Sequence, residues 1–118
     1  MFLDGNFVDQ IITGNCKNVL QDIPANSVHL TITSPPYRNA IDYDLHVSGN
    51  GRYYRGKTKI GTSAYLDDMS EIFNHHVYRA TKEGGYCCIV IGNEVVNGTI
   101  LPLPHMLLSK LVQPAGNW

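Results

Sequence analysis

Two consecutive prolines follow a segment rich in β-branched residues, and this junction constrains the fold more than any other feature of the sequence. The segment Val28 to Thr33 has the composition of a β-strand and is bounded by turn-forming residues. Proline has a fixed φ and lacks an N–H donor, so Pro35 and Pro36 end the strand. A residue before proline is also held extended. The sequence therefore predicts a strand that stops abruptly at a rigid segment beginning at Ser34.

The rest of the chain alternates between strand and helix patterns. Apolar spacing predicts a short strand over 11–15, a helix over 16–23, a helix over 62–80 capped by Thr62-Ser63, a strand buried on both faces over 86–91, and a helix over 102–112. We expect turns at Asn26-Ser27 and at Asn97-Gly98-Thr99. This order of elements predicts an α/β fold with a mostly parallel sheet and right-handed crossovers.

Length, charge and cysteine usage narrow the class of protein. A chain of 118 residues suffices for one small domain, and its net charge of −1 gives no global attraction to nucleic acid. Cys16, Cys87 and Cys88 are odd in number and lack a CxxC spacing, so we expect reduced thiols and a cytoplasmic protein. No apolar run is long enough to span a membrane. His75 and His76 would point about 100° apart on a helix, so we expect no metal site.

The residues after the predicted strand have a chemistry of their own. In open α/β sheets, ligands bind beyond the carboxyl ends of the strands, which is where Ser34 lies. The two prolines remove N–H donors, so the Ser34 hydroxyl and the backbone carbonyls remain as acceptors. Tyr37 adds an aromatic face on which a base can stack. This arrangement suits a planar group that bears an amine, such as the exocyclic amine of cytosine or adenine.

A family resemblance supports this interpretation. The motif Thr33-Ser34-Pro35-Pro36-Tyr37, with the flanking Gly14-Asn15-Cys16 and Glu83-Gly84-Gly85-Tyr86, resembles that of β-class, S-adenosylmethionine-dependent DNA amino-methyltransferases of bacteria and archaea. The resemblance covers most of the chain outside residues 38–62. It implies a Rossmann-like fold and methyl transfer to the amine of a flipped base. The Ser form of the motif resembles the cytosine-N4 enzymes more than the adenine-N6 enzymes.

The resemblance also implies roles for individual residues. Ser34, Pro35, Pro36 and Tyr37 correspond to the catalytic motif. In that family the region of Asn15 and Cys16 faces the adenine of S-adenosylmethionine, although Asp is common where this chain has Asn15. An ordinary turn residue is an equal alternative for Asn15.

A basic segment follows the motif. Residues 38–62 lack helical or strand periodicity, and a loop of this length is usually functional or mobile. We expect its cations to contact the phosphates of double-stranded DNA; they are Arg38, Arg52, Arg55, Lys57 and Lys59. The alternative is a solvated surface loop.

The family's glycine-rich turn, Phe-x-Gly-x-Gly, does not occur in this sequence. In the family it contributes most of the S-adenosylmethionine site and comes later in the chain. We therefore expect residues 1–118 to be the N-terminal catalytic portion of an enzyme whose C-terminal cofactor half is missing, and to be inactive alone. The alternatives are an adenine-N6 enzyme, a protein-amide or RNA-amine methyltransferase, and an inactive truncated module that binds DNA or a protein partner.

Overall fold

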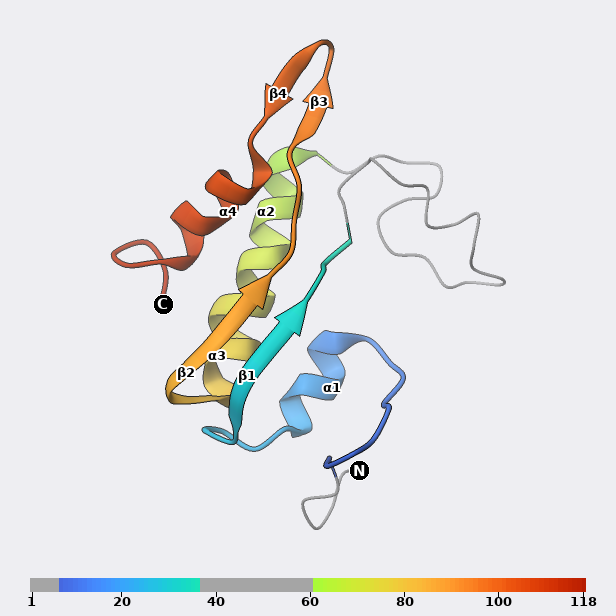
Figure 1. The fold of residues 1–118 in the computed structure, drawn as a ribbon, viewed down its shortest axis with the longest axis vertical. Helices are drawn as coiled ribbons and strands as arrows, with labels where there is room; N and C mark the ends of the chain where they lie inside the picture. Colours follow the sequence, from blue (N-terminus) through green and yellow to red (C-terminus); the bar gives the residue numbers. More distant parts are fainter. Residues whose placement is uncertain (1–6, 37–60) are drawn as a thin grey trace.

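The computed structural model describes residues 7–36 and 61–118, in an α/β arrangement. In chain order, the elements are α1 (Cys16–Asp22), β1 (Val28–Thr33), α2 (Thr62–Glu71), the π-helical turn η2 (Ile72–Val77), α3 (Tyr78–Ala80), β2 (Thr81–Ile89), β3 (Glu94–Val96), β4 (Thr99–Leu101) and α4 (Leu103–Leu111). Strands β1 and β2 form a parallel pair, and β3 and β4 form an antiparallel hairpin that projects from the body (Figure 1). The expected α/β class is therefore correct, with one parallel strand pair in the described residues.

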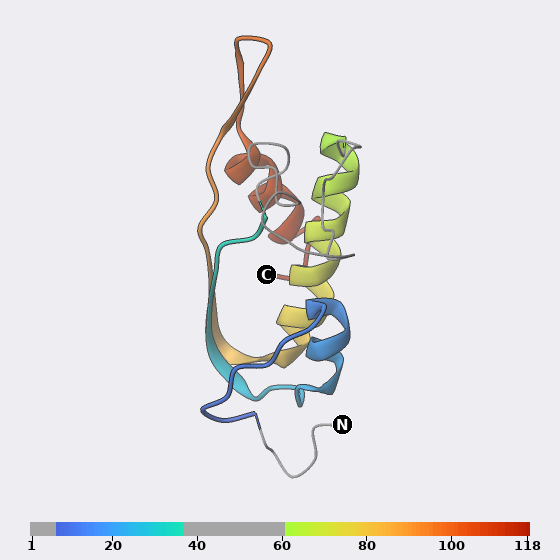
Figure 2. The same cartoon turned by 90° about the vertical axis from the view of Figure 1, so that its right-hand side faces the viewer.

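The described helices all lie on one side of the β1–β2 sheet (Figure 2). The core lies on this side of the sheet. It forms where the apolar residues of α2 and η2 pack against those of α4. The buried apolar cluster consists of Tyr65, Leu66, Met69, Phe73, Val77, Leu103, Leu107 and Leu111. Burial of such side chains stabilises the fold by roughly 1.5–3 kcal/mol each. The helical spacing in the sequence predicted this face of α2 and α4.

Within residues 7–36 and 61–118, no element covers the other face of the sheet, which corrects the prediction that the strand over 86–91 is buried on both sides. Alternate residues point to opposite faces of a strand. Ile32 and Tyr86 point away from the helices and are 70% and 71% exposed, and Leu30 and Val90 are exposed with them. The prediction failed because a continuous apolar run shows that both faces can be buried, and only tertiary contacts decide whether they are.

Two further predictions need correction near the chain's first described residues and at the start of α2. Residues 11–15 form no strand, and Ile11 is fully exposed, because no neighbouring strand pairs with them. Gly61, rather than Thr62 or Ser63, occupies the N-cap of α2, and no side chain caps that helix. The long helix ends at Ala80, and β2 already begins at Thr81.

Parallel strands β1 and β2 come close together at Gly85. A Cβ there would lie 2.9 Å from both the His29 and the Lys82 carbonyl oxygens, a contact that real Cβ atoms essentially never make. The pairing shifts register between Val28 and Leu30, beside this glycine. Gly85 therefore allows the strands to approach here, and beyond it the register is regular as far as Thr33, where the candidate site begins.

Arg79 connects α1 to the end of the long helix. Its Nη2 atom donates hydrogen bonds of 2.6 Å to the Leu20 carbonyl and 2.7 Å to the Ile23 carbonyl. The last carbonyls of a helix lack partners within it, and cations are favourable there. Arg79 thus fixes α1 beside β1 and the long helix. The other helix predictions, α1 and α4, agree with the structure to within one residue at each end.

Candidate active site

A cavity of about 640 Å³ lies between α1, the carboxyl end of β1 and the long helix α2–η2–α3. Most of its wall is apolar, with residues from all three elements and from the segments that flank α1: Ile12, Val19, Leu20, Ile23, Val28, Met69, Ile72, Phe73, Val77 and Ala80. Polar groups line it as well, from Asn15, Cys16, Lys17, Thr33, Ser34 and Asp68. Small-molecule sites commonly have such a volume and such a composition.

The proline motif lies at the end of β1 that borders this cavity. Thr33 is still paired, since its carbonyl accepts a hydrogen bond of 2.8 Å from the Val90 amide. Beyond it Ser34 is exposed, Pro35 is buried and Pro36 is half-buried. All three line the cavity. The sequence placed these residues at a strand end, and the structure agrees.

Tyr65 fixes the second proline of the motif. This tyrosine is fully buried in α2, and its hydroxyl donates a hydrogen bond of 2.7 Å to the Pro36 carbonyl oxygen. Pro36 is thereby held against the core. The apolar spacing over 62–80 predicted a helix that contains Tyr65 but not this contact. A buried tyrosine usually has a hydrogen-bond partner for its hydroxyl, but the sequence does not indicate which residue that partner is.

Asn15 and Cys16 reach the same cavity from α1. Asn15 is the N-cap of this helix, and its Oδ1 atom accepts a hydrogen bond of 2.9 Å from the Lys17 amide. Asn15 is therefore an N-cap residue that also lines the cavity, and its expected contact with S-adenosylmethionine remains a prediction. Cys16 is half-buried, and burial together with the nearby Asp68 carboxylate raises the pKa of its thiol. Cys16 thus stays a neutral thiol near pH 7.

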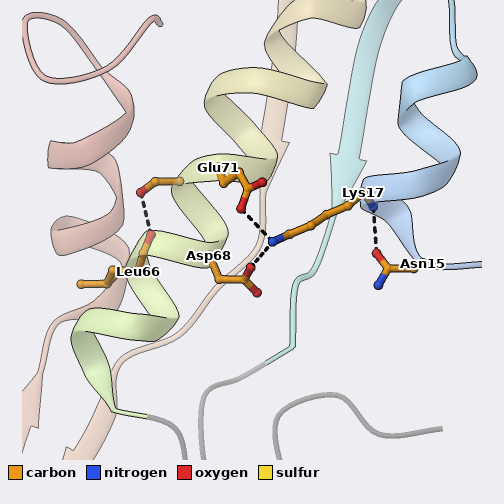
Figure 3. A network of polar contacts seen from close by, with 6 residues as sticks. Asn15, Lys17, Leu66, Asp68 and Glu71 are labelled. Carbon is orange, nitrogen blue, oxygen red and sulfur yellow. Dashed lines mark hydrogen bonds and ion pairs between the residues drawn. The ribbon is translucent and has the colours of Figure 1, made fainter.

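Lys17 is a charged cavity residue that sequence reasoning missed. Its ammonium bridges α1 to α2, with Nζ 2.5 Å from Asp68 Oδ1 and 2.8 Å from Glu71 Oε2 (Figure 3). Hydrogen bonds to Asp68 and Glu71 raise the pKa of Lys17, and the bond from Lys17 lowers the pKa of Glu71. Nothing local in the sequence signals this contact, since more than fifty positions separate the partners. The bridge fixes the spacing between the two helices that border the cavity.

Several predicted site residues lie outside the described part of the chain. They are Tyr37 and the basic residues Arg38, Arg52, Arg55, Lys57 and Lys59. Their proposed roles, and the proposed DNA-contacting loop over 38–62, remain predictions.

The arrangement offers acceptors beside an apolar cavity. Within residues 7–36 and 61–118, neither the Ser34 hydroxyl nor the Pro35 carbonyl has a hydrogen-bond partner, whereas the Pro36 carbonyl is occupied by Tyr65. A planar ligand with an amine at its edge can donate to the first two groups. The same residues contain no cluster of three His, Cys, Asp or Glu side chains around a possible metal position. They also contain no helix long and apolar enough to cross a bilayer.

Comparison with models of known protein families and with curated protein sequences finds no match for this chain.

Proposed function

We propose that this chain is the catalytic portion of an S-adenosylmethionine-dependent DNA amino-methyltransferase that acts on cytosine N4. One observation carries the proposal. The cavity brings together Asn15 and Cys16, which the resemblance assigns to the methyl donor, with Ser34, Pro35 and Pro36, which it assigns to the target amine. Eighteen positions separate Cys16 from Ser34 in the sequence, and the fold brings both to one cavity.

Ser34 and Pro35 would hold the target amine. The lone pair of a base amine is delocalised into the ring, so the amine is a poor nucleophile. Hydrogen bonds from its N–H groups to Ser34 Oγ and to the Pro35 carbonyl favour a more tetrahedral nitrogen. Since these bonds strengthen toward the transition state, they raise the rate of transfer. Tyr65 contributes indirectly, because it fixes the Pro36 carbonyl and with it the direction of the motif.

The cavity also suits part of the methyl donor. Its apolar wall and its volume fit a flat heterocycle, and the Asn15 side chain and the Cys16 backbone are polar groups at its border. S-adenosylmethionine supplies an electrophilic methyl group when it is bound. A glycine-rich turn from a C-terminal half of the enzyme would complete this site. The basic residues between 38 and 59 would contact the phosphates of double-stranded DNA.

The proposal is tested by a methylation assay on duplex DNA with labelled S-adenosylmethionine. We expect no transfer by the 118-residue chain alone, and transfer when a segment that carries the Phe-x-Gly-x-Gly turn is added. In that mixture Ser34→Ala should lower the single-turnover rate by about tenfold or more, because a lost hydrogen bond worth ~1.4 kcal/mol in the transition state gives that factor. Ser109→Ala is the control, since the Ser109 hydroxyl donates to the His105 carbonyl within α4.

The outcomes separate the rival functions. Modified-nucleoside analysis that finds N6-methyladenine would assign the other base, and methylated RNA or protein would assign another substrate class. DNA binding without transfer in the mixture would indicate an inactive binding module. An unchanged rate in Ser34→Ala removes Ser34 from the mechanism. Micromolar binding of S-adenosylmethionine by the chain alone, measured by calorimetry, would contradict the need for a second half.

A further inference from the structure

A π-helical turn forms part of the cavity wall. The turn η2 joins α2 to α3, and its residues Ile72, Phe73 and Val77 line the cavity. In a π-helical turn, backbone hydrogen bonds join residues five positions apart instead of four. Such turns are rare in proteins and occur frequently at functional sites. The contacts that hold this turn in place therefore affect the shape of the cavity.

The π-helical turn changes which residue faces the interior. Successive residues of a regular α-helix are about 100° apart. A regular helix continuing from Tyr65, Met69 and Phe73 would place His76 about 20° from the centre of their face and Val77 about 80° from it. The structure instead buries Val77, which is 6% exposed, and leaves His76 only half-buried. The wider turn thus presents Val77 rather than His76 to the interior.

Two residues near the end of the described chain hold this turn from outside. The Trp118 indole Nε1 donates a hydrogen bond of 3.0 Å to the Phe73 carbonyl. Asn117 makes two bonds to Asn74, from its Nδ2 to the carbonyl at 2.8 Å and from its backbone amide to the side-chain Oδ1 at 3.0 Å. The Tyr78 amide also bonds to the Phe73 carbonyl, so this oxygen is shared between the helix and Trp118.

The segment that carries these donors is itself fixed to α4. The Trp118 amide donates to the Leu111 carbonyl at 3.0 Å, and the Gln113 amide donates to the Trp118 carbonyl at 3.1 Å. The Trp118 ring also meets Tyr78 edge-on, with ring centroids 5.2 Å apart. The segment that holds the backbone of Asn74 is therefore itself fixed in place by the core helix α4.

We infer that Asn117 and Trp118 are positioning residues that keep Ile72–Val77 in the π-helical register and thereby keep Val77, not His76, in the cavity wall. Loss of these donors should allow the turn to return toward the α-helical register, which rotates His76 inward. The inference rests on the proposed function only for the identity of the ligand in the cavity. The register itself can be measured in the chain without any ligand.

The test uses NMR on the 118-residue chain and on the variants Trp118→Phe and Asn117→Asp. Trp118→Phe keeps an aromatic ring and removes the Nε1 donor, and Asn117→Asp replaces the Nδ2 donor with an acceptor. We expect the Tyr78 amide to exchange its hydrogen about tenfold faster in both, because each loses a hydrogen bond that holds the turn. The Val77 methyl and His76 ring signals should shift. Ser109→Ala removes a similar side-chain-to-carbonyl bond inside α4 and should change neither.

The result that overturns the inference is equally specific. Unchanged Tyr78 exchange and unchanged Val77 and His76 signals in the folded variants would show that Asn117 and Trp118 only add packing. Because Asn117 is exposed, Asn117→Asp should remain folded and decides the matter if Trp118→Phe does not fold. Failure of methyl transfer would leave these ligand-free measurements unaffected, so the two proposals can fail separately.

Discussion

The Tyr65 hydroxyl donates a hydrogen bond of 2.7 Å to the Pro36 carbonyl oxygen. The bond joins α2 to the segment that leaves β1, across 29 positions of sequence. Since Pro36 has a fixed φ, anchoring its carbonyl also orients the residues before it. The direction of the Ser34–Pro36 segment therefore depends on a side chain in the core.

Removal of this hydroxyl should destabilise the fold. In Tyr65→Phe the Pro36 carbonyl loses a buried donor, and we expect a decrease of about 1–2 kcal/mol in the free energy of unfolding, measured by urea denaturation. Tyr78→Phe is the matched control, because Tyr78 is exposed and its ring contact with Trp118 survives the change. Equal effects of the two substitutions would show that the bond to Pro36 contributes nothing specific.

Asn15 should stabilise α1 through its side-chain cap. Asn15→Ala removes the acceptor for the Lys17 amide, so we expect a loss of about 0.5–2 kcal/mol in the free energy of unfolding. Asn15→Asp keeps an acceptor and should be close to neutral. Asn18→Ala, the same change at an exposed position inside α1, should not destabilise, since alanine is the better helix former. A similar loss at both positions would contradict the capping role.

The Lys17 bridge makes stability depend on acid pH. Lys17 lowers the pKa of Glu71 below its ordinary value of 4.5 in the folded chain. A lowered carboxyl pKa contributes stability that is present above 4.5 and is lost as pH falls through the folded value. In Lys17→Met, the free energy of unfolding should decrease less between pH 7 and pH 3 than it does in the wild type. Lys110→Met is the control, because the Lys110 ammonium lies farther from its carboxylate partner Asp67, at 3.6 Å. Parallel pH profiles for the variant and the wild type would contradict the prediction.

The three thiols should differ in reactivity at mildly alkaline pH. Cys88 is exposed, whereas burial raises the pKa of Cys87 to about 11 and also raises the pKa of Cys16. Because the thiolate is the reactive form, an aromatic disulfide reagent at pH 8 should label Cys88 fast and the other two slowly. Cys88→Ser should abolish the fast phase, and Cys87→Ser should retain it. A fast phase that survives Cys88→Ser would place the reactive thiol elsewhere.

The sequence was most informative where local physics decides the structure. Helical spacing located α1, the long helix and α4, and the prolines located the end of β1. The β3–β4 hairpin was not predicted, although Asn97-Gly98 is a strong signal for its two-residue turn, and both residues have positive φ. Only the turn was predicted, because three-residue strands leave little periodicity to detect.

In the candidate site, too, locally determined features were predicted and long-range contacts were not. Ser34, Pro35 and Pro36 were found because proline acts on its immediate neighbours. Lys17 and Tyr65 were missed as site residues, because their partners lie at least 29 positions away along the chain. The π-helical turn was also missed. A regular helix accommodates the same apolar residues, and the turn depends on donors from Asn117 and Trp118 that local spacing does not reveal.

The face of the β1–β2 sheet that no described element covers has a consequence for how this protein tolerates substitution. Ile32 and Tyr86 are mostly exposed to water, so a polar residue at either position costs the folded chain little and reduces its tendency to aggregate. Stability of the isolated chain therefore gives no reason to retain apolar residues there. If natural variants keep isoleucine and tyrosine at these positions, this face of the sheet is under selection to contact another molecule. If they replace them with polar residues such as threonine and lysine, this face makes no such contact.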